Sequence, residues 1–312
     1  MCASYVTTGA EIYRKTVKNN YLEPVLLQRS TIQLLRFPFS FFLLPVYLFA
    51  LSRLLHPNWL HALLIFFILH VLVYPASNGY NSYMDRDEES IGGVKKPLQP
   101  TPELFAVTVA FDATAVILSF LISIPFALGI VLYILASRAY SYRGIRLKRY
   151  PLTGYLIVII FQGAVTFWLV YHGCHPALTL HVPAAGMLAG SLLIGGFYPL
   201  TQIYQFEADK RDGVRTISMV LGYRNTFLFT GIVYFFAFAV LACYFITDLE
   251  VKQLMILQVI MLPVLVYFFV WARKVWRNHS AADFAHTMKM NVLASCCSSA
   301  AFLTLIILRF FE

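Results

Sequence analysis

Nine runs of about 20 mostly apolar residues recur along the chain and leave few folds open to it. An α-helix needs roughly 20 apolar residues to cross the hydrocarbon core of a bilayer. The runs lie near residues 33–54, 59–77, 103–121, 124–140, 153–172, 180–200, 225–246, 253–272 and 288–309. They predict an all-α, polytopic membrane protein in which about nine transmembrane helices form one bundle around a central apolar cavity.

The residue composition excludes a water-soluble protein. Hydrophobic residues make up 59% of the 312 residues and charged residues 12%, whereas an average soluble domain carries about 25% charged residues. We therefore predict a short segment over residues 1–32 and a single transmembrane domain over residues 33–312. The third and fourth runs are continuous. We divide them at Ser123-Ile124-Pro125, because one unbroken helix would overshoot the membrane and proline favours a helix start.

Basic residues indicate how the bundle is oriented. Together with the adjoining helix ends, the N-terminal segment and the connections after the second, fourth, sixth and eighth runs hold 21 of the 24 Lys and Arg residues. The other side holds only Arg53, Lys252 and Arg309. Because cytoplasmic connections carry an excess of basic residues, we predict a cytoplasmic N-terminus, in the cell (inner) membrane if the chain is bacterial. This placement accounts for the net charge of +9 without a nucleic-acid partner, and nothing in the sequence indicates an obligate protein partner.

Acidic residues gather in two short clusters on the predicted cytoplasmic side. Seven of the 15 acidic residues fall there: Asp85, Asp87, Glu88 and Glu89 after the second run, and Glu207, Asp209 and Asp212 after the sixth. A cluster of solvated loop charges is the simplest interpretation. It does not explain why acidic residues collect where basic residues would serve the topology, nor the helical spacing within both clusters.

That spacing places several polar side chains on common helix faces. If the second helix continues past Pro75, Asn81, Asp85 and Glu89 follow one another at intervals of four residues. The second cluster repeats the arrangement. Carboxylate and amide oxygens suit Mg²⁺, which is typically held by one or two protein carboxylates together with substrate phosphates. The candidate metal ligands are Asn81, Asp85, Glu89, Gln205, Asp209 and Asp212.

A basic segment after the fourth run complements the two clusters. Residues 138–149 contain five basic residues and no acidic one. They either anchor the topology alone or also donate charge-assisted hydrogen bonds to phosphate oxygens. Lys95 and Lys96, just past the first cluster, could do the same. Asn78 lies one helical turn before the first metal face and either supports Asp85 or contacts a diphosphate.

Three of these segments, in this order, resemble the motifs of the UbiA-type intramembrane prenyltransferases. Asn81-x-x-x-Asp85-x-x-x-Glu89 is similar to that family's first aspartate-rich motif, and Lys96-Pro97-Leu98 to the basic segment after it. Further similar segments are Tyr140-Ser141, Arg146-Leu147-Lys148-Arg149, and Asp209 with Gly213, Arg215-Thr216 and Leu221-Gly222. Arg36-Phe37-Pro38 at the start of the first run also resembles the family, so the likeness covers nearly the whole chain.

The resemblance implies a Mg²⁺-dependent enzyme that faces the cytoplasm. Such an enzyme transfers a prenyl group from an allylic diphosphate to a lipophilic acceptor in the bilayer, an aromatic compound or a quinone precursor. The chemistry needs positively charged groups next to the departing diphosphate and an apolar chamber for the allylic cation. Catalytic roles are implied for Asp85, Asp209 and Lys148. The residues expected to bind the diphosphate are Asn78, Asn81, Lys96, Tyr140, Arg146, Lys148, Lys210 and Arg215.

Two positions depart from the family pattern. Gln205 stands where the second motif usually has its first Asp, and Glu89 stands where the first motif usually ends in Asp. A membrane terpene cyclase, in which the same ionisation ends in ring closure, is therefore an alternative. A secondary transporter fits less well, because transporter sites lie near the bilayer midplane. Asp112, an acid inside a run, has either a functional role or a structural partner such as Arg36 or a histidine.

Overall fold

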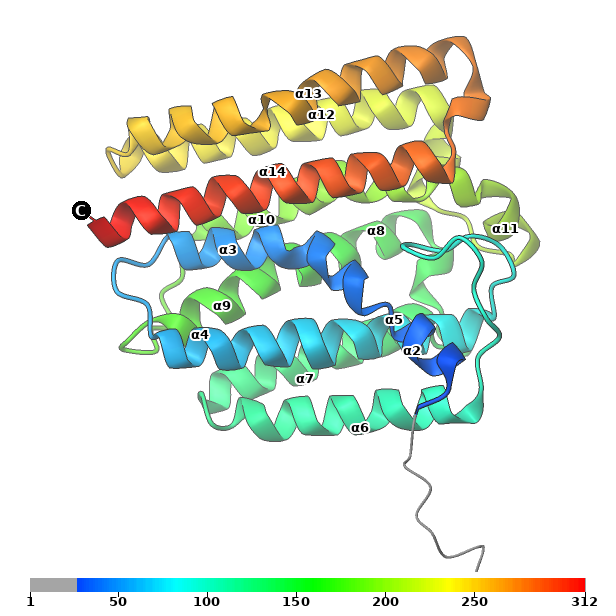
Figure 1. Ribbon diagram of the computed structural model, residues 1–312, viewed down its shortest axis with the longest axis horizontal. Helices are drawn as coiled ribbons and strands as arrows, with labels where there is room; N and C mark the ends of the chain where they lie inside the picture. Colours follow the sequence, from blue (N-terminus) through cyan, green and yellow to red (C-terminus); the bar gives the residue numbers. More distant parts are fainter. Residues whose placement is uncertain (1–26, 312) are drawn as a thin grey trace, which may run out of the picture.

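Long helices account for most of the residues that the structure describes. The computed structural model describes residues 27–311, and these form helices with a single bridge between Ile91 and Val94 in place of a sheet. Within that range, nine helical stretches are long and apolar enough to cross a membrane, by length and composition. Figure 1 shows them side by side in one bundle. The predicted all-α, multi-pass fold is confirmed, whereas most of the predicted 1–32 segment lies outside the described residues.

Several of the nine spans are built from more than one helical piece. The first consists of α2 (Arg29–Leu35), η1 (Phe37–Leu43) and α3 (Leu44–Ser52); the second of α4 (Trp59–Phe66), η2 (Phe67–Val73) and α5 (Tyr74–Asp85); the third is α6 (Pro102–Ser119) and the fourth α7 (Ile124–Ser141). The fifth consists of α8 (Pro151–Ile159), η4 (Ile160–Val165) and α9 (Thr166–Cys174); the sixth of α10 (Ala184–Phe197), η5 (Tyr198–Thr201), η6 (Ile203–Gln205) and α11 (Phe206–Arg211). The last three are α12 (Ile217–Thr247), α13 (Val251–Arg277) and α14 (Phe284–Phe311), and the short turns η3 (Leu147–Arg149) and η7 (His279–Ala281) lie in connections.

The predicted division between the third and fourth spans is confirmed. α6 ends at Ser119, and the side chain of Ser123 accepts a hydrogen bond from the backbone N–H of Phe126 at the start of α7. Pro125 stands in the first turn, where its missing N–H costs no intrahelical bond. The Ser123 hydroxyl also contacts Nε2 of His172 at 2.8 Å. The connection between α6 and α7 is therefore hydrogen-bonded to α9.

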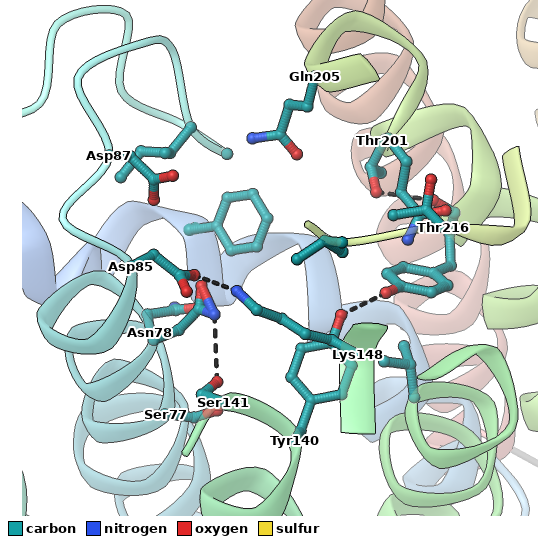
Figure 2. A pocket seen from close by; sticks show the side chains of 18 of the residues that line it. Ser77, Asn78, Asp85, Asp87, Tyr140, Ser141, Lys148, Thr201, Gln205 and Thr216 are labelled. Carbon is teal, nitrogen blue, oxygen red and sulfur yellow. Dashed lines mark hydrogen bonds and ion pairs between the residues drawn. The ribbon is translucent and has the colours of Figure 1, made fainter. Parts of the chain in front are cut away.

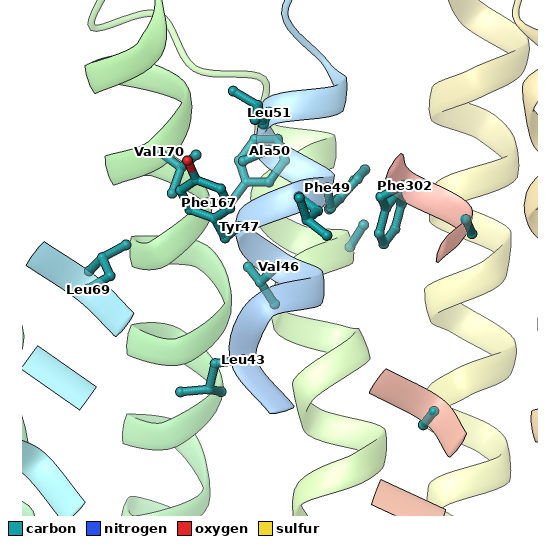
Figure 3. Close-up of a cluster of buried hydrophobic side chains, with 14 of the residues drawn as sticks. Leu43, Val46, Tyr47, Phe49, Ala50, Leu51, Leu69, Phe167, Val170 and Phe302 are labelled. Carbon is teal, nitrogen blue, oxygen red and sulfur yellow. The ribbon is translucent and has the colours of Figure 1, made fainter. Parts of the chain in front are cut away.

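Buried aromatic side chains pack around α3 (Figure 3). The buried ring of Phe49 lies 5.0 Å from that of Phe167 on α9 and 4.9 Å from that of Phe302 on α14. Lipid tails are as apolar as these side chains, so close van der Waals packing, rather than transfer out of water, stabilises such contacts in a bilayer. α3 therefore fixes the fifth and ninth spans relative to the first.

The fifth and sixth spans approach each other closely at a glycine. Gly163 lies in the π-helical turn η4, and a Cβ atom there would come 2.4 Å from Cα of Ser191 on α10. That distance leaves no room for a side chain, so glycine permits the contact between the two backbones. The wide turn changes the helical register beside Phe161 and Gln162 (both in η4), which line the internal cavity.

Asp112, whose role the sequence left open, is half of an ion pair. It pairs with Arg138 on α7, and Arg138 also donates to the carbonyl of Thr108 at 3.2 Å. The guanidinium carbon lies 3.9 Å from the ring centroid of Tyr80 on α5. The predicted partners, Arg36 or a histidine, are wrong, because Arg138 stands nearer on the adjacent helix. Asp112 therefore joins the third span to its neighbours.

Candidate active site

The connections after the second, fourth and sixth spans meet at one end of the bundle, the end of Figure 1 where α11 lies. They cover an internal cavity of about 210 Å³. Polar and charged side chains line its outer part: Arg36, Ser77, Asn78, Asn81, Asp85, Asp87, Tyr140, Ser141, Lys148, Thr201, Gln202, Gln205, Asp209, Asp212 and Thr216. Figure 2 shows how the labelled members of this group face one another. The inner wall includes Tyr133, Ile157, Val158, Phe161, Gln162, Met288 and Asn291.

The first acidic cluster enters the cavity from the end of a helix. Asn81 and Asp85 lie four residues apart on α5 and both line the cavity. The helix ends at Asp85, because Arg86 adopts a left-handed conformation with φ 55°. The predicted continuation of the helix to Glu89 is therefore wrong. The Glu89 side chain is 51% exposed and pairs with Arg211 outside the cavity lining, so the structure does not bring it to the other candidate ligands.

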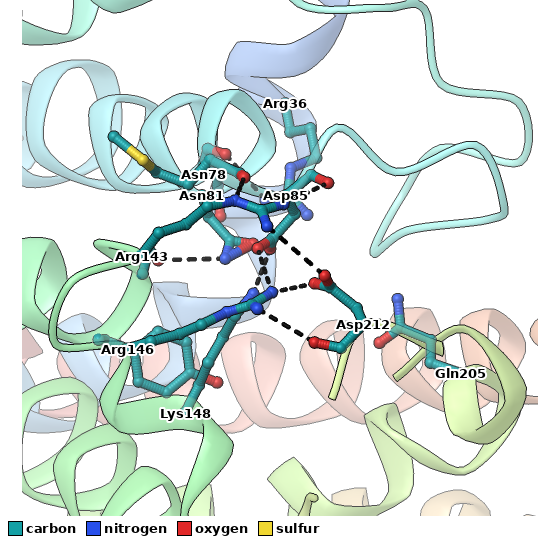
Figure 4. Close-up of polar contacts among 12 residues, drawn as sticks. Arg36, Asn78, Asn81, Asp85, Arg143, Arg146, Lys148, Gln205 and Asp212 are labelled. Carbon is teal, nitrogen blue, oxygen red and sulfur yellow. Dashed lines mark hydrogen bonds and ion pairs between the residues drawn. The ribbon is translucent and has the colours of Figure 1, made fainter. Parts of the chain in front are cut away.

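Two cations contact Asp85, and one of them also reaches the second cluster (Figure 4). Lys148, in the short turn η3, forms an ion pair with Asp85. Nη2 of Arg146 lies 3.4 Å from Oδ1 of Asp85 and also pairs with the carboxylate of Asp212, while Nη1 donates to the Asp212 carbonyl at 3.1 Å. Carboxylates from the second and sixth spans thus share one guanidinium, and the basic segment after the fourth span lies between them.

The second cluster lines the same cavity from two short helical pieces and the residue that follows them, rather than from one helix. Gln205 ends η6, Asp209 lies in α11, and Asp212 follows α11 directly; all three line the cavity. The side-chain amide of Gln205 donates a hydrogen bond of 3.2 Å to the carbonyl of Ser90 in the 86–101 connection. A carboxylate could not make this bond. Gln205 therefore holds the two clusters together at the position where the family motif usually has Asp.

The residues that the sequence predicts to bind a diphosphate divide into two groups. Those that line the cavity are Asn78, Asn81, Tyr140 and Lys148, and Arg146 contacts two of its carboxylates. The hydroxyl groups of Tyr140 and Tyr198 lie 2.5 Å apart. Lys96, Lys210 and Arg215 have exposed side chains and do not line the cavity.

Sequence reasoning missed two charged residues at the cavity. Asp87 lines it because the left-handed Arg86 turns the chain back from the helix axis. Burial raises the pKa of Asp87 to about 6, with a further contribution from the charge of Asp85. Buried Arg36 donates to the carbonyl groups of Asn78 at 3.1 Å and Gly92 at 3.4 Å. The available signals were the membership of Asp87 in the first acidic cluster and of Arg36 in the Arg36-Phe37-Pro38 segment, but neither residue was predicted to belong to the site.

The donor set at the cavity suits a hard cation that a substrate helps to bind. In the part of the chain that the structure describes, no three Asp, Glu, His or Cys side chains are grouped closely enough to hold a metal ion alone. Oxygen donors nevertheless converge from both clusters: Asn81, Asp85, Asp87, Gln205, Asp209 and Asp212. Mg²⁺ retains several waters and is commonly held by few carboxylates plus substrate phosphates, rather than by a protein cage. The residues present therefore fit Mg²⁺ with a diphosphate.

Comparison with known proteins assigns the chain to a family. The sequence model of the UbiA prenyltransferase family matches residues 40–293. The chain belongs to the UbiA prenyltransferase family. This match covers most of the chain and includes both acidic clusters, so the resemblance inferred from the motifs is confirmed. No curated protein sequence shows significant similarity to this UbiA-family chain.

Solved structures share the UbiA fold with this protein. A UbiA homologue from Archaeoglobus fulgidus, bound to GPP and Mg²⁺, is 18% identical with a TM-score of 0.66, over 89% of this chain and 99% of that one. The apo structure of a UbiA homologue from Aeropyrum pernix K1 is 22% identical with a TM-score of 0.64, over 88% and 99%. A digeranylgeranylglyceryl phosphate synthase is 16% identical with a TM-score of 0.58, over 91% and 99%. The similarity of these chains lies in the fold.

Proposed function

We propose that this UbiA-family protein is a Mg²⁺-dependent prenyltransferase. It transfers the prenyl group of an allylic diphosphate to a lipophilic acceptor, an aromatic compound or a quinone precursor, within the bilayer. One observation carries the proposal: Asp85 and Asp209, from clusters far apart in the sequence, line one cavity together with Lys148. A relative of the same fold is described as bound to GPP and Mg²⁺, which supports the same substrate class here.

The outer part of the cavity suits the departure of diphosphate. The C–O bond to the prenyl carbon breaks, and negative charge grows on the leaving oxygens. The residues that would hold Mg²⁺ are Asp85, Asp209 and Asp212, with the amide oxygens of Asn81 and Gln205. When bound, the ion would neutralise part of that charge. Lys148 and Arg146 add positive charge from the protein itself, in a largely buried place where electrostatic interactions are strong.

The inner part of the cavity suits the allylic cation. Tyr133 and Phe161 line it, and their rings lie 5.9 Å apart with edge-to-face geometry. Aromatic faces attract a cation that has left water. The buried apolar wall excludes the water that would otherwise capture the cation. The prenyl chain is as apolar as the bilayer, so the apolar side chains of the inner wall suit it.

A single incubation separates this proposal from its alternative. Purified protein is given Mg²⁺ and geranyl diphosphate or a longer homologue, first alone and then with an organic extract of membranes, while diphosphate and organic products are measured. A prenylated product that forms only with extract is the expected result. A cyclic hydrocarbon formed without extract would instead identify a terpene cyclase. Absence of diphosphate release with every chain length would contradict both.

A further inference from the structure

The ninth span brings an unsatisfied amide to the cavity. Asn291 on α14 lines the inner wall with Met288 from the same helix. The residue is 1% exposed, and neither Oδ1 nor Nδ2 has a hydrogen-bond partner among the described residues. An asparagine amide offers two N–H donors and two acceptor lone pairs. All of this capacity is unused at the edge of the substrate cavity.

An unpaired amide in this buried position lowers the stability of the folded protein. A buried polar group without a partner destabilises the folded protein, and polar residues inside membrane spans commonly mark functional sites. Buried Thr287 and Ser299 lie on the same face of α14, one turn before and two turns after Asn291, and their hydroxyls also have no partner among the described residues. They do not line the cavity, and a hydroxyl can rotate to a carbonyl of its own helix. The longer amide of Asn291 has the cavity beside it.

Asn291 comes from a helix that carries none of the charged groups at the cavity. It lies seven residues into α14, about 10 Å along the helix axis from Phe284 at 1.5 Å per residue. The charged groups Asp85, Lys148 and Arg146 gather instead where helices end. The prenyl chain is a hydrocarbon and can neither donate a hydrogen bond to the amide nor accept one. A second substrate with a hydrogen-bonding group would supply the partner.

We infer that Asn291 recognises the acceptor through a neutral oxygen group, a hydroxyl or a carbonyl, on its lipophilic ring. This inference rests on the proposed prenyltransferase activity and extends it to the second substrate. The amide is uncharged and both donates and accepts, so it complements a neutral oxygen better than a carboxylate or an ammonium group. A site built to hydrogen-bond a substrate group rejects analogues that lack the group, because the buried partner is then left unpaired. Asn291 is thus a specificity-determining residue.

The test uses Asn291→Leu, which keeps the shape of the side chain and removes both polar atoms, and Asn291→Ser, which keeps one hydrogen-bonding group. Ser299→Ala, on the same face of α14 but away from the cavity, is the matched control. Each protein receives Mg²⁺, geranyl diphosphate and a dilution series of membrane extract. The apparent KM for the extract acceptor and the KM for the diphosphate are measured separately.

Asn291→Leu is expected to raise the acceptor KM at least tenfold and to leave the diphosphate KM within twofold. Asn291→Ser should fall between Asn291→Leu and the wild type, and Ser299→Ala should match the wild type. The melting temperature of Asn291→Leu should hold or rise, because an unsatisfied amide is removed; a residue that only supports the fold would lower it. Mass spectrometry of the product should find a hydroxyl or carbonyl on the acceptor.

Several results would overturn the inference. An unchanged acceptor KM in Asn291→Leu, an equal rise of both KM values, or an acceptor without a hydroxyl or carbonyl would each exclude the assigned role while the prenyltransferase activity stood. A cyclic hydrocarbon made by the wild type without extract would remove the acceptor altogether. If the wild type released no diphosphate, the proposed function itself would fail and the inference with it.

Discussion

Lys148 is the cation that lines the cavity beside Asp85. Its replacement by Met removes the charge and keeps most of the stem, so diphosphate should bind more weakly because charge-assisted hydrogen bonds are lost. We expect the KM for an allylic diphosphate to rise at least about tenfold, equivalent to roughly 1.4 kcal/mol. Lys96→Met is the matched control, since Lys96 is exposed outside the cavity lining. Equal effects of the two substitutions would contradict the site.

Gln205 is a candidate metal ligand, and we also expect its side-chain amide to hold the two clusters together through a hydrogen bond. Gln205→Asp restores the usual family residue, but it removes the N–H that bonds to the Ser90 carbonyl. A net hydrogen bond contributes about 1 kcal/mol, so amide hydrogen exchange in the 86–101 connection should accelerate about fivefold. Gln205→Glu, which keeps the length of the side chain without the donor, should behave similarly. If amide hydrogen exchange in both variants were as slow as in the wild type, the Gln205–Ser90 hydrogen bond would not stabilise this connection.

The individual site residues could be predicted only in part, and the reason is the backbone at the helix ends. Helical spacing correctly placed Asn81 and Asp85 on one face of α5. It failed at Glu89 and missed Asp87, because it assumed a continuing helix where Arg86 turns left-handed. No local pattern marks an arginine for that conformation. Lys96 and Lys210 were predicted from charge and motif position, and neither specifies the direction in which a long side chain points.

Close contact at Gly163 fixes the fifth span against the sixth and positions the inner cavity wall. A Cβ added there meets backbone atoms of Ser191, which cannot move aside as a side chain would. Gly163→Ala should therefore destabilise the protein by roughly 1–3 kcal/mol through overpacking, measured by unfolding in mixed micelles of mild detergent and sodium dodecyl sulfate.

Gly231, in the middle of α12, is the control for that substitution, because a Cβ atom added there would meet nothing within 4 Å. Since alanine favours a helix more than glycine does, Gly231→Ala should be neutral or stabilising by up to about 1 kcal/mol. A Gly163→Ala protein as stable as Gly231→Ala would show that the two spans can separate without cost.

Apolar runs predicted the existence of all nine spans but not their internal form. The sixth run ends near residue 200, whereas its helical pieces continue to Arg211. Hydropathy detects the part of a helix inside the hydrocarbon, and polar turns that carry the site extend beyond it. The π-helical turns η2 and η4 likewise leave no sign in the sequence, because their register depends on packing against other spans.

At the scale of the whole molecule, the distribution of basic residues predicts that the cavity end faces the cytoplasm. Lys96 lies in the connection at that end, and Leu249, which is 89% exposed, lies in the connection between α12 and α13 at the opposite end of Figure 1. In a cysteine-free background, Lys96→Cys should react with a membrane-impermeant maleimide only from the cytoplasmic side, and Leu249→Cys only from the other. The reverse pattern would invert the proposed orientation.

The account as a whole requires that the two acidic clusters act on one ligand. Calorimetric titration of the purified protein with geranyl thiodiphosphate, an unreactive analogue, tests this most directly. We expect binding that requires Mg²⁺ and weakens at least about 100-fold, or roughly 2.7 kcal/mol, in both Asp85→Asn and Asp209→Asn. Glu89→Gln, outside the cavity, should bind as the wild type does. Wild-type affinity in either aspartate variant, or binding that is indifferent to Mg²⁺, would contradict a shared diphosphate site.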